Sequence, residues 1–159
     1  MSSQIRYCIC TFGRQGVAVE VELFLDKAPS SSRFLTSLLP IEADIFNSKW
    51  NGAELFTVLP PMNPSVVENQ SESVRRGDVV MFHWPTGHRG MPNRPRAGAI
   101  GAHTELGFYY GELIRAYSPA GPATGTLVGQ IVQGLDDLAE VAQTMRRAGF
   151  GRLKIVPRP

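Results

Sequence analysis

The feature that most limits the fold is a succession of short segments in which apolar and polar residues alternate, separated by Gly and Pro. In residues 17–23, Val and Leu alternate with Ala18, Glu20 and Glu22, which is the period of a half-buried antiparallel strand. Sixteen Gly and twelve Pro make up about 18% of the 159 residues, against roughly 12% in average proteins. The chain therefore predicts short strands joined by turns, in one domain over residues 1–159.

The same reasoning, applied along the chain, predicts eight strands and two helices. The strands are expected at residues 5–12, 17–23, 43–50, 53–59, 78–84, 106–114, 126–132 and 152–156, and the helices at 30–39 and from 135 onward. A two-residue turn at Asn51-Gly52 is expected to join the third and fourth strands. So many short strands with two helices favour a mainly β fold: a closed or nearly closed antiparallel barrel with two capping helices.

The two helices carry their own start and stop signals. Pro29 suits the first turn of the first helix, and Pro40 ends that helix. In the second helix, acidic residues 136–137 lie near the positive end and basic residues 146–147 near the negative end. Gly149 is placed to end this helix in a left-handed conformation.

Charge, hydropathy and cysteine content limit the function classes. A net charge of +2 is too weak a field to indicate nucleic acid as a partner. No apolar run approaches the ~20 residues of a membrane span, and the N-terminal residues lack the apolar core of a signal peptide. Cys8 and Cys10 are expected on one face of a strand, as small core residues rather than metal ligands. We expect a cytoplasmic protein without a cofactor. Besides ligand binding and catalysis, a role in assembly as a homo-oligomer is a third alternative for its function.

Several segments resemble cyclophilins. Leu-Asp-Lys-Ala-Pro at residues 25–29 is similar to the approach to their first helix, and Val-Gly-Gln-Ile-Val-Gln-Gly-Leu-Asp-Asp-Leu at 128–138 to the approach to their second. Gly-Asp-Val-Val-Met-Phe at 77–82 and Leu-Gly-Phe-Tyr-Tyr-Gly at 106–111 resemble uncharacterised bacterial and archaeal cyclophilin-like proteins. The resemblance implies a cyclophilin-like barrel of about eight strands with two capping helices.

The residues that give cyclophilins their proline-isomerase activity are missing. Their Phe-His-Arg segment corresponds to Phe56, Thr57 and Val58, and no Gln-Gly-Gly-Asp motif occurs. An apolar Val cannot replace the hydrogen bonds of a guanidinium group. The resemblance therefore implies a fold without the usual isomerase; the alternative is an isomerase with a rebuilt site that uses an Arg of the loop at residues 85–102.

We expect a small organic ligand or a peptide to bind where aromatic residues gather. Aromatic walls with a few polar groups are typical of a small-molecule pocket, although the same residues could simply form the barrel core. Arg89 and Arg94, with Arg96, lie in the Gly- and Pro-rich loop, where they could close over an anionic ligand. The candidate ligand-binding residues are Phe56, His83, Trp84, Arg89, Arg94, His103, Phe108, Tyr109 and Tyr110.

A metal-dependent enzyme is the other chemical alternative. His83, His88, His103 and Glu105 supply ligand types that suit zinc, if the ends of the long loop bring them together. Their spacing matches no recognised zinc motif, so we assign no metal ligand. The interpretation that needs no metal is one histidine satisfied at a strand end and two solvated loop histidines.

Overall fold

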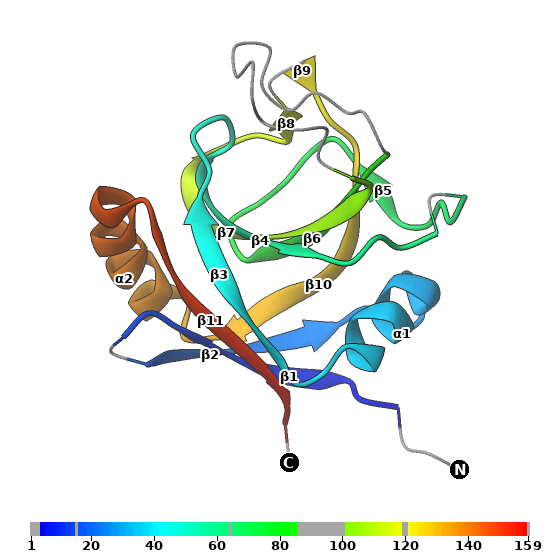
Figure 1. Ribbon diagram of the computed structural model, residues 1–159, viewed down its shortest axis with the longest axis horizontal. Coiled ribbons are helices and arrows are strands. Elements are labelled where there is room, and N and C mark those ends of the chain that lie inside the picture. The colour runs from blue at the N-terminus through cyan, green and yellow to red at the C-terminus, as the bar shows by residue number, and fades with distance from the viewer. Residues whose placement is uncertain (1–3, 15, 64, 86–100, 119–120, 159) are drawn as a thin grey trace.

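The computed structural model describes residues 4–14, 16–63, 65–85, 101–118 and 121–158. Eight antiparallel strands form the barrel that Figure 1 shows, with the two helices apart from each other on its outside. The barrel strands are β1 (Tyr7–Phe12), β2 (Val17–Leu23), β3 (Ile41–Asn47), β4 (Gly52–Leu59), β6 (Asp78–Trp84), β7 (His103–Ile114), β10 (Gly125–Gln133) and β11 (Phe150–Pro157). The predicted mainly β barrel with two helices is confirmed.

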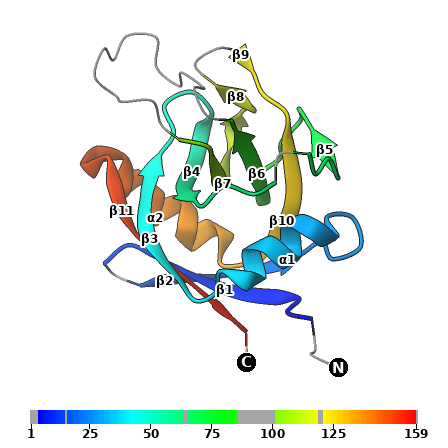
Figure 2. The ribbon, with the colours of Figure 1, turned by 45° about the vertical axis from the view of Figure 1, so that its right-hand side comes forward.

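The barrel closes because its two outermost strands pair with each other. The order around it is β2-β1-β11-β3-β4-β7-β6-β10, and β10 pairs back onto β2. The short strand β5 (Gln70–Ser71) extends the sheet from β10. A separate hairpin of β8 (Tyr117–Ser118) and β9 (Gly121–Pro122) stands above the end of the barrel (Figure 2).

Both helices begin where the sequence predicts, within one residue, and α2 also ends as predicted, whereas α1 ends two residues before the expected Leu39. Helix α1 (Pro29–Ser37) has its proline in the first turn, and α2 (Leu135–Ala148) carries acidic residues in its first turn and basic residues in its last. Gly149 ends α2 with φ +86°, in the left-handed region. Both helices pack on the barrel core through their apolar faces, α2 with Leu138, Ala142 and Met145 and α1 with Leu35.

Alternation along the strands produces two separate hydrophobic cores. The barrel interior contains Val79, Met81, Leu106, Phe108 and Tyr110, together with both cysteines, which are free and buried. The opposite face of strands β6 and β7 carries a smaller cluster of Val80, Phe82, Tyr109, Ala116 and Ala123. Here the segment that bears β8 and β9 supplies the covering residues Ala116 and Ala123. Strands β6 and β7 therefore bury side chains on both their inner and their outer face.

The β3–β4 connection differs from the expected two-residue turn. Strand β3 ends at Asn47, and Gly52 with φ +79° already belongs to β4. The turn is longer because the Ser48 hydroxyl accepts a hydrogen bond from the Asn51 backbone N–H (3.1 Å), while the Ser48 N–H donates to the Glu54 carbonyl (2.9 Å). Side-chain capping by Ser48 thus replaces the type I′ turn predicted from Asn-Gly.

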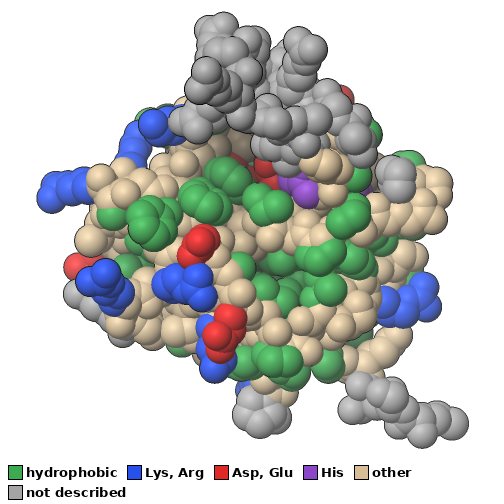
Figure 3. All heavy atoms as spheres, viewed as in Figure 1, with side chains coloured by type: hydrophobic (Ala, Val, Ile, Leu, Met, Phe, Trp, Pro, Cys, Tyr) green, Lys and Arg blue, Asp and Glu red, His purple; other side chains and the backbone are tan. Residues whose placement is uncertain are grey.

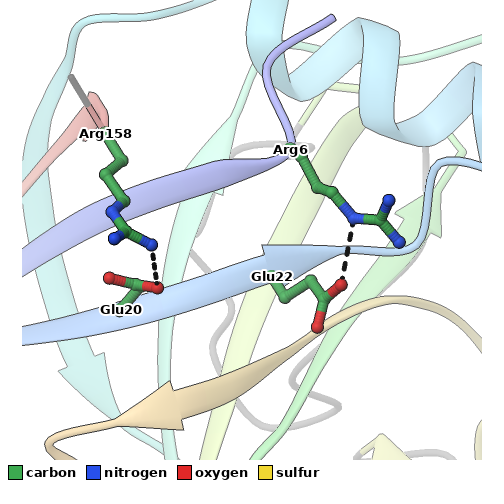
Figure 4. A network of polar contacts seen from close by, with 4 residues as sticks. All are labelled: Arg6, Glu20, Glu22 and Arg158. Carbon is green, nitrogen blue, oxygen red and sulfur yellow. Dashed lines mark hydrogen bonds and ion pairs between the residues drawn. The ribbon is translucent and has the colours of Figure 1, made fainter.

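Two ion pairs link the chain ends to β2. Arg158 donates to Glu20 at 2.8 Å, and Arg6 donates to Glu22 at 3.0 Å (Figure 4). The backbone N–H of Arg158 also donates to the Tyr7 carbonyl, which extends the pairing of β1 with β11. Among the described residues, none of the helices is long and apolar enough to cross a membrane.

Candidate functional site

The outer face of strands β11, β3, β4 and β7 exposes a row of phenylalanines. Phe150 pairs with Phe46 across β11 and β3, Phe46 pairs with Phe56 across β3 and β4, and Phe56 pairs with Gly107 of β7. Directly paired residues of antiparallel strands place their side chains on one face. The row therefore runs across four strands and ends at a residue without a side chain.

Two of the three phenylalanines in this row are exposed and Phe56 is half-buried, whereas most apolar side chains of the barrel are buried. Phe150 is 57% exposed and Phe46 37%, and Val58, two residues beyond Phe56, is 46% exposed. The rings of Phe46 and Phe56 lie 5.7 Å apart between centroids. Figure 3 shows hydrophobic side chains side by side on this side of the molecule. Contiguous exposed apolar side chains are typical of binding surfaces.

A histidine and a carboxylate border the row on β7. Val58 pairs with Glu105, and the His103 Nε2 lies 3.5 Å from the Glu105 carboxylate. The His103 Nδ1 lies 2.9 Å from the Gly101 carbonyl oxygen. Both ring nitrogens of His103 therefore face oxygen atoms. We call Phe46, Phe56, Val58, His103, Glu105 and Phe150 the aromatic face.

Glu54 lies on the same side of β4 but is almost completely buried. Its carboxylate accepts a hydrogen bond from Asn51 Nδ2 at 2.6 Å, and it covers Gly107, where a Cβ atom would come within 2.2 Å of Oε1. Burial raises the pKa of Glu54 to about 7, despite the hydrogen bonds from Asn51 and Ser48. Burial and the neighbouring Glu54 carboxylate also raise the pKa of Tyr109.

Four of the predicted residues lie on the outer face and three lie inside the barrel. Phe56, Trp84, His103 and Tyr109 are outside, and His83, Phe108 and Tyr110 are inside, as the pairings of β6 with β7 require. Tyr109 and Tyr110 are at most 2% exposed. These two tyrosines thus contribute to the two cores rather than to an open wall. Arg89 and Arg94 lie outside the described residues, as do His88 and Arg96.

The inner histidine has a polar setting of its own. His83 Nδ1 lies 3.4 Å from the Thr104 hydroxyl, and burial lowers the pKa of His83, an effect that Glu68 opposes. Glu68 accepts hydrogen bonds from the backbone N–H groups of Ser30 and Ser31 at the start of α1. These bonds outweigh burial and lower the pKa of Glu68. Glu68 therefore serves as the cap of this helix.

The structure separates the histidines of the metal alternative. Trp84 pairs with His103, and His83 pairs with Thr104, so the two histidines project from opposite faces of the sheet. Among the residues that the structure describes, no group of three or more His, Cys, Asp or Glu could hold a metal ion.

Sequence reasoning did not identify Phe46, Phe150 or Glu54 as parts of this region. Phe46 follows Glu42 and Asp44 on the polar positions of its strand. A large apolar residue at a polar position is a signal that could have marked this face. Phe150 directly follows the Gly149 that ends α2 and lies before the closing strand expected at residues 152–156, whereas β11 begins at Phe150 itself. The burial of Glu54 depends on distant Tyr109 and could not be read from local sequence.

One protein family and two solved structures are similar to this chain. The family described as "Protein of unknown function (DUF3830)" matches residues 10–156. A solved structure of McbB in complex with tryptophan is similar, with a TM-score of 0.65 and 14% identity; the match covers 95% of this chain but 44% of McbB. The hypothetical protein AF2241 from Archaeoglobus fulgidus is similar with a TM-score of 0.56 and 20% identity, over 99% of this chain and 100% of AF2241. A comparison with curated proteins finds no match. At these identities the structures show the barrel fold alone.

Proposed function

The chain belongs to the DUF3830 family of proteins of unknown function, and from this premise we propose that it is a cyclophilin-like barrel that binds a small organic ligand or a peptide segment on its aromatic face. The observation that carries the proposal is the row of paired side chains from the exposed Phe150 and Phe46 to the half-buried Phe56, continued by the exposed Val58. The buried phenylalanines of the barrel show that the chain can place such rings inside. Phenylalanine rings that remain on the outer face therefore indicate a surface that binds a partner.

The charges beside the row define the chemistry of the ligand. In the proposed complex an apolar group covers the rings, and an N–H donor beside it reaches the carboxylate of Glu105, whose side chain is 28% exposed. Aromatic amines, amides and peptide segments with an apolar side chain all have this combination. McbB was solved with tryptophan, an aromatic molecule with an amino group, which supports the choice of an indole as the first probe.

Binding to the aromatic face is tested by NMR titration of the isotope-labelled protein with N-acetyltryptophan amide. We expect the largest shifts at residues of β3, β4 and β7, and at least a tenfold weaker affinity in Phe56→Ala, because the ring loses its apolar contact. Val67→Ala, which shortens a side chain that is 77% exposed in a loop, is the matched control. Phe46→Ser provides a second variant in case Phe56→Ala folds poorly. Equal affinity in the folded variants would exclude this face.

Proline isomerisation is the alternative, and Val58 argues against it. In the resemblance, Val58 occupies the place of the arginine that polarises the peptide bond. Its side chain points outward and is exposed, so the position is accessible but apolar. We expect no acceleration of cis/trans exchange in an Ala-Pro peptide, measured by exchange NMR with and without the protein. Acceleration that persists in Val58→Ala would instead indicate a rebuilt isomerase site.

A further inference from the structure

A second candidate site lies at the tip of the β3–β4 hairpin, which the aromatic face does not use. A surface depression of about 410 Å³ is lined there by Lys49, Trp50, Asn51, Gly52, Glu112, Leu113, Ile114 and Arg115. We propose that this depression binds a small organic carboxylate with an apolar body. The argument rests on the strand irregularity that forms the depression and on the side chains that it presents.

The depression exists because β7 carries more residues here than β4 can pair. The pairing steps from Glu54 with Tyr109 to Gly52 with Ile114, so the intervening residues of β7 bulge outward. Leu113 is consequently 89% exposed. Such bulges often redirect side chains beside functional sites. Gly52 makes the close contact possible, because a Cβ atom there would come within 2.0 Å of the Leu113 carbonyl oxygen.

Arg115 is held in position at the rim. Its Nε donates to the Trp50 carbonyl at 2.8 Å, and its guanidinium carbon lies 4.4 Å from the centroid of the Tyr117 ring. Its backbone N–H also donates to the Asn51 carbonyl. Within the described part of the chain, the two terminal nitrogens of Arg115 have no hydrogen-bond partner. A guanidinium fixed through Nε and stacked on an aromatic ring loses little freedom when it binds a carboxylate.

The other lining residues fit the two ends of such a ligand. Lys49 is exposed and, like Glu112, has no ion-pair partner among the described residues. The lining of the depression therefore holds two cations, Lys49 and Arg115, and one anion, Glu112. The cationic excess favours a carboxylate. Trp50 is half-buried and Leu113 is exposed, which provides apolar surface for the body of the ligand.

The test compares ligands that differ only in charge, namely indole-3-acetate and indole-3-acetamide, by NMR titration of the whole protein. We expect the acetate to shift residues 49–52 and 112–115 and to bind at least tenfold more tightly than the amide. Arg115→Gln and, independently, Lys49→Gln should each weaken binding several-fold. Arg147→Gln, which removes an exposed cation on α2, should leave it unchanged. Equal binding of acid and amide in both this pair and the peptide pair described next, or full affinity for indole-3-acetate in both folded site variants, would overturn the proposal.

Two further arms identify the source of the carboxylate and separate the two sites. A short peptide ending in Gly-Leu with a free carboxylate, compared with its amidated form, distinguishes a peptide C-terminus from a free organic acid; tighter binding of either acid over its amide supports the site. Phe56→Ala should leave the affinity of the hairpin site for indole-3-acetate unchanged. If Phe56→Ala instead abolishes the binding of indole-3-acetate, this ligand binds on the aromatic face, and the proposal for the hairpin is overturned.

Discussion

Glu54 shows how one residue can join distant parts of a fold. Its carboxylate bonds to Asn51, and Asn51 in turn accepts a hydrogen bond from the backbone N–H of Tyr117 at 2.7 Å. The carboxyl group thus links the β3–β4 hairpin to the segment that covers Tyr109. Gly107 leaves the space that the carboxyl group occupies. Burying a group that can ionise makes this link sensitive to pH.

The first prediction follows from the raised pKa of Glu54, about 7 against 4.5. The folded state holds the Glu54 proton more tightly than the unfolded state, so the resulting stability is full below pH 4.5 and is lost as the pH rises through 7. Glu54→Gln, which stays neutral, should gain on the order of 2–3 kcal/mol in unfolding free energy relative to wild type between pH 5 and 9. Urea unfolding at a series of pH values measures this difference.

The control for this prediction is Glu140→Gln, which neutralises an exposed carboxylate on α2. Its unfolding free energy relative to wild type should change little over the same pH range. A difference for Glu54→Gln that stays constant from pH 5 to 9 would mean that Glu54 is not protonated in the folded protein at neutral pH.

At the scale of elements, the ends of α2 are set by two glycines with different surroundings. Gly134 before the helix and Gly149 after it both have positive φ, +81° and +86°. A Cβ atom at Gly149 would meet nothing within 4 Å, whereas one at Gly134 would lie 2.6 Å from the Ala18 carbonyl oxygen. Only Gly134 therefore combines backbone strain with a steric clash.

We expect Gly149→Ala to lower the unfolding free energy by about 1 kcal/mol, the cost of a left-handed conformation for alanine. Gly134→Ala should lower it by more, about 2–4 kcal/mol, because β2 must also move. Urea unfolding of the two variants at one pH measures both values. Equal losses would show that the contact with Ala18 relaxes without cost.

The elements were largely predictable because each depends on local pattern. Strand alternation and the capping residues of α2 are visible within ten residues, and they placed most barrel strands and both helices. The Asn51-Gly52 turn was mispredicted because the Ser48 side chain offers its own hydrogen bond. Strand β7 begins at His103, three residues before the expected start, because it pairs with Trp84 of β6.

The candidate site was less predictable than the fold. His83 and Trp84 are consecutive in a strand, and so are Tyr109 and Tyr110, so each pair must divide between the two faces. A pocket that includes both members of such a pair is incompatible with the strand geometry that the sequence itself predicts. Recognition of the row of phenylalanines required the pairing of β3 with β4 and with β11, which lies about 100 residues further along the chain.

At the scale of the whole molecule, closure of the barrel depends on β2, which pairs with β1 on one side and β10 on the other. Its outward carboxylates, Glu20 and Glu22, bind Arg158 and Arg6 from the two ends of the described chain. The Glu20 side chain is 10% exposed and that of Glu22 is 30% exposed. If its arginine partner is removed, water can therefore solvate the carboxylate of Glu22 more readily than that of Glu20.

Arg158→Ala should consequently lower the unfolding free energy by about 1–3 kcal/mol, because it leaves the Glu20 carboxylate desolvated. Arg6→Ala should lower it by less than about 1 kcal/mol, as expected of an exposed pair. Thermal and urea unfolding measure both effects. Glu20→Gln in the Arg158→Ala background should recover part of the loss; no recovery would assign the effect to the contact of Arg158 with the Tyr7 ring.

The division of β4 between two faces has a consequence for protein engineering. Leu55, Thr57 and Leu59 face the interior and are at most 4% exposed, while Phe56 and Val58 alternate with them on the outer face. A combinatorial library that randomises Phe46, Phe56, Val58 and Phe150 would therefore vary a continuous surface and leave the interior sequence intact. The barrel is in this sense a scaffold for selecting new binding specificities, because its foldability and its recognition surface are encoded at alternate positions of the same strands.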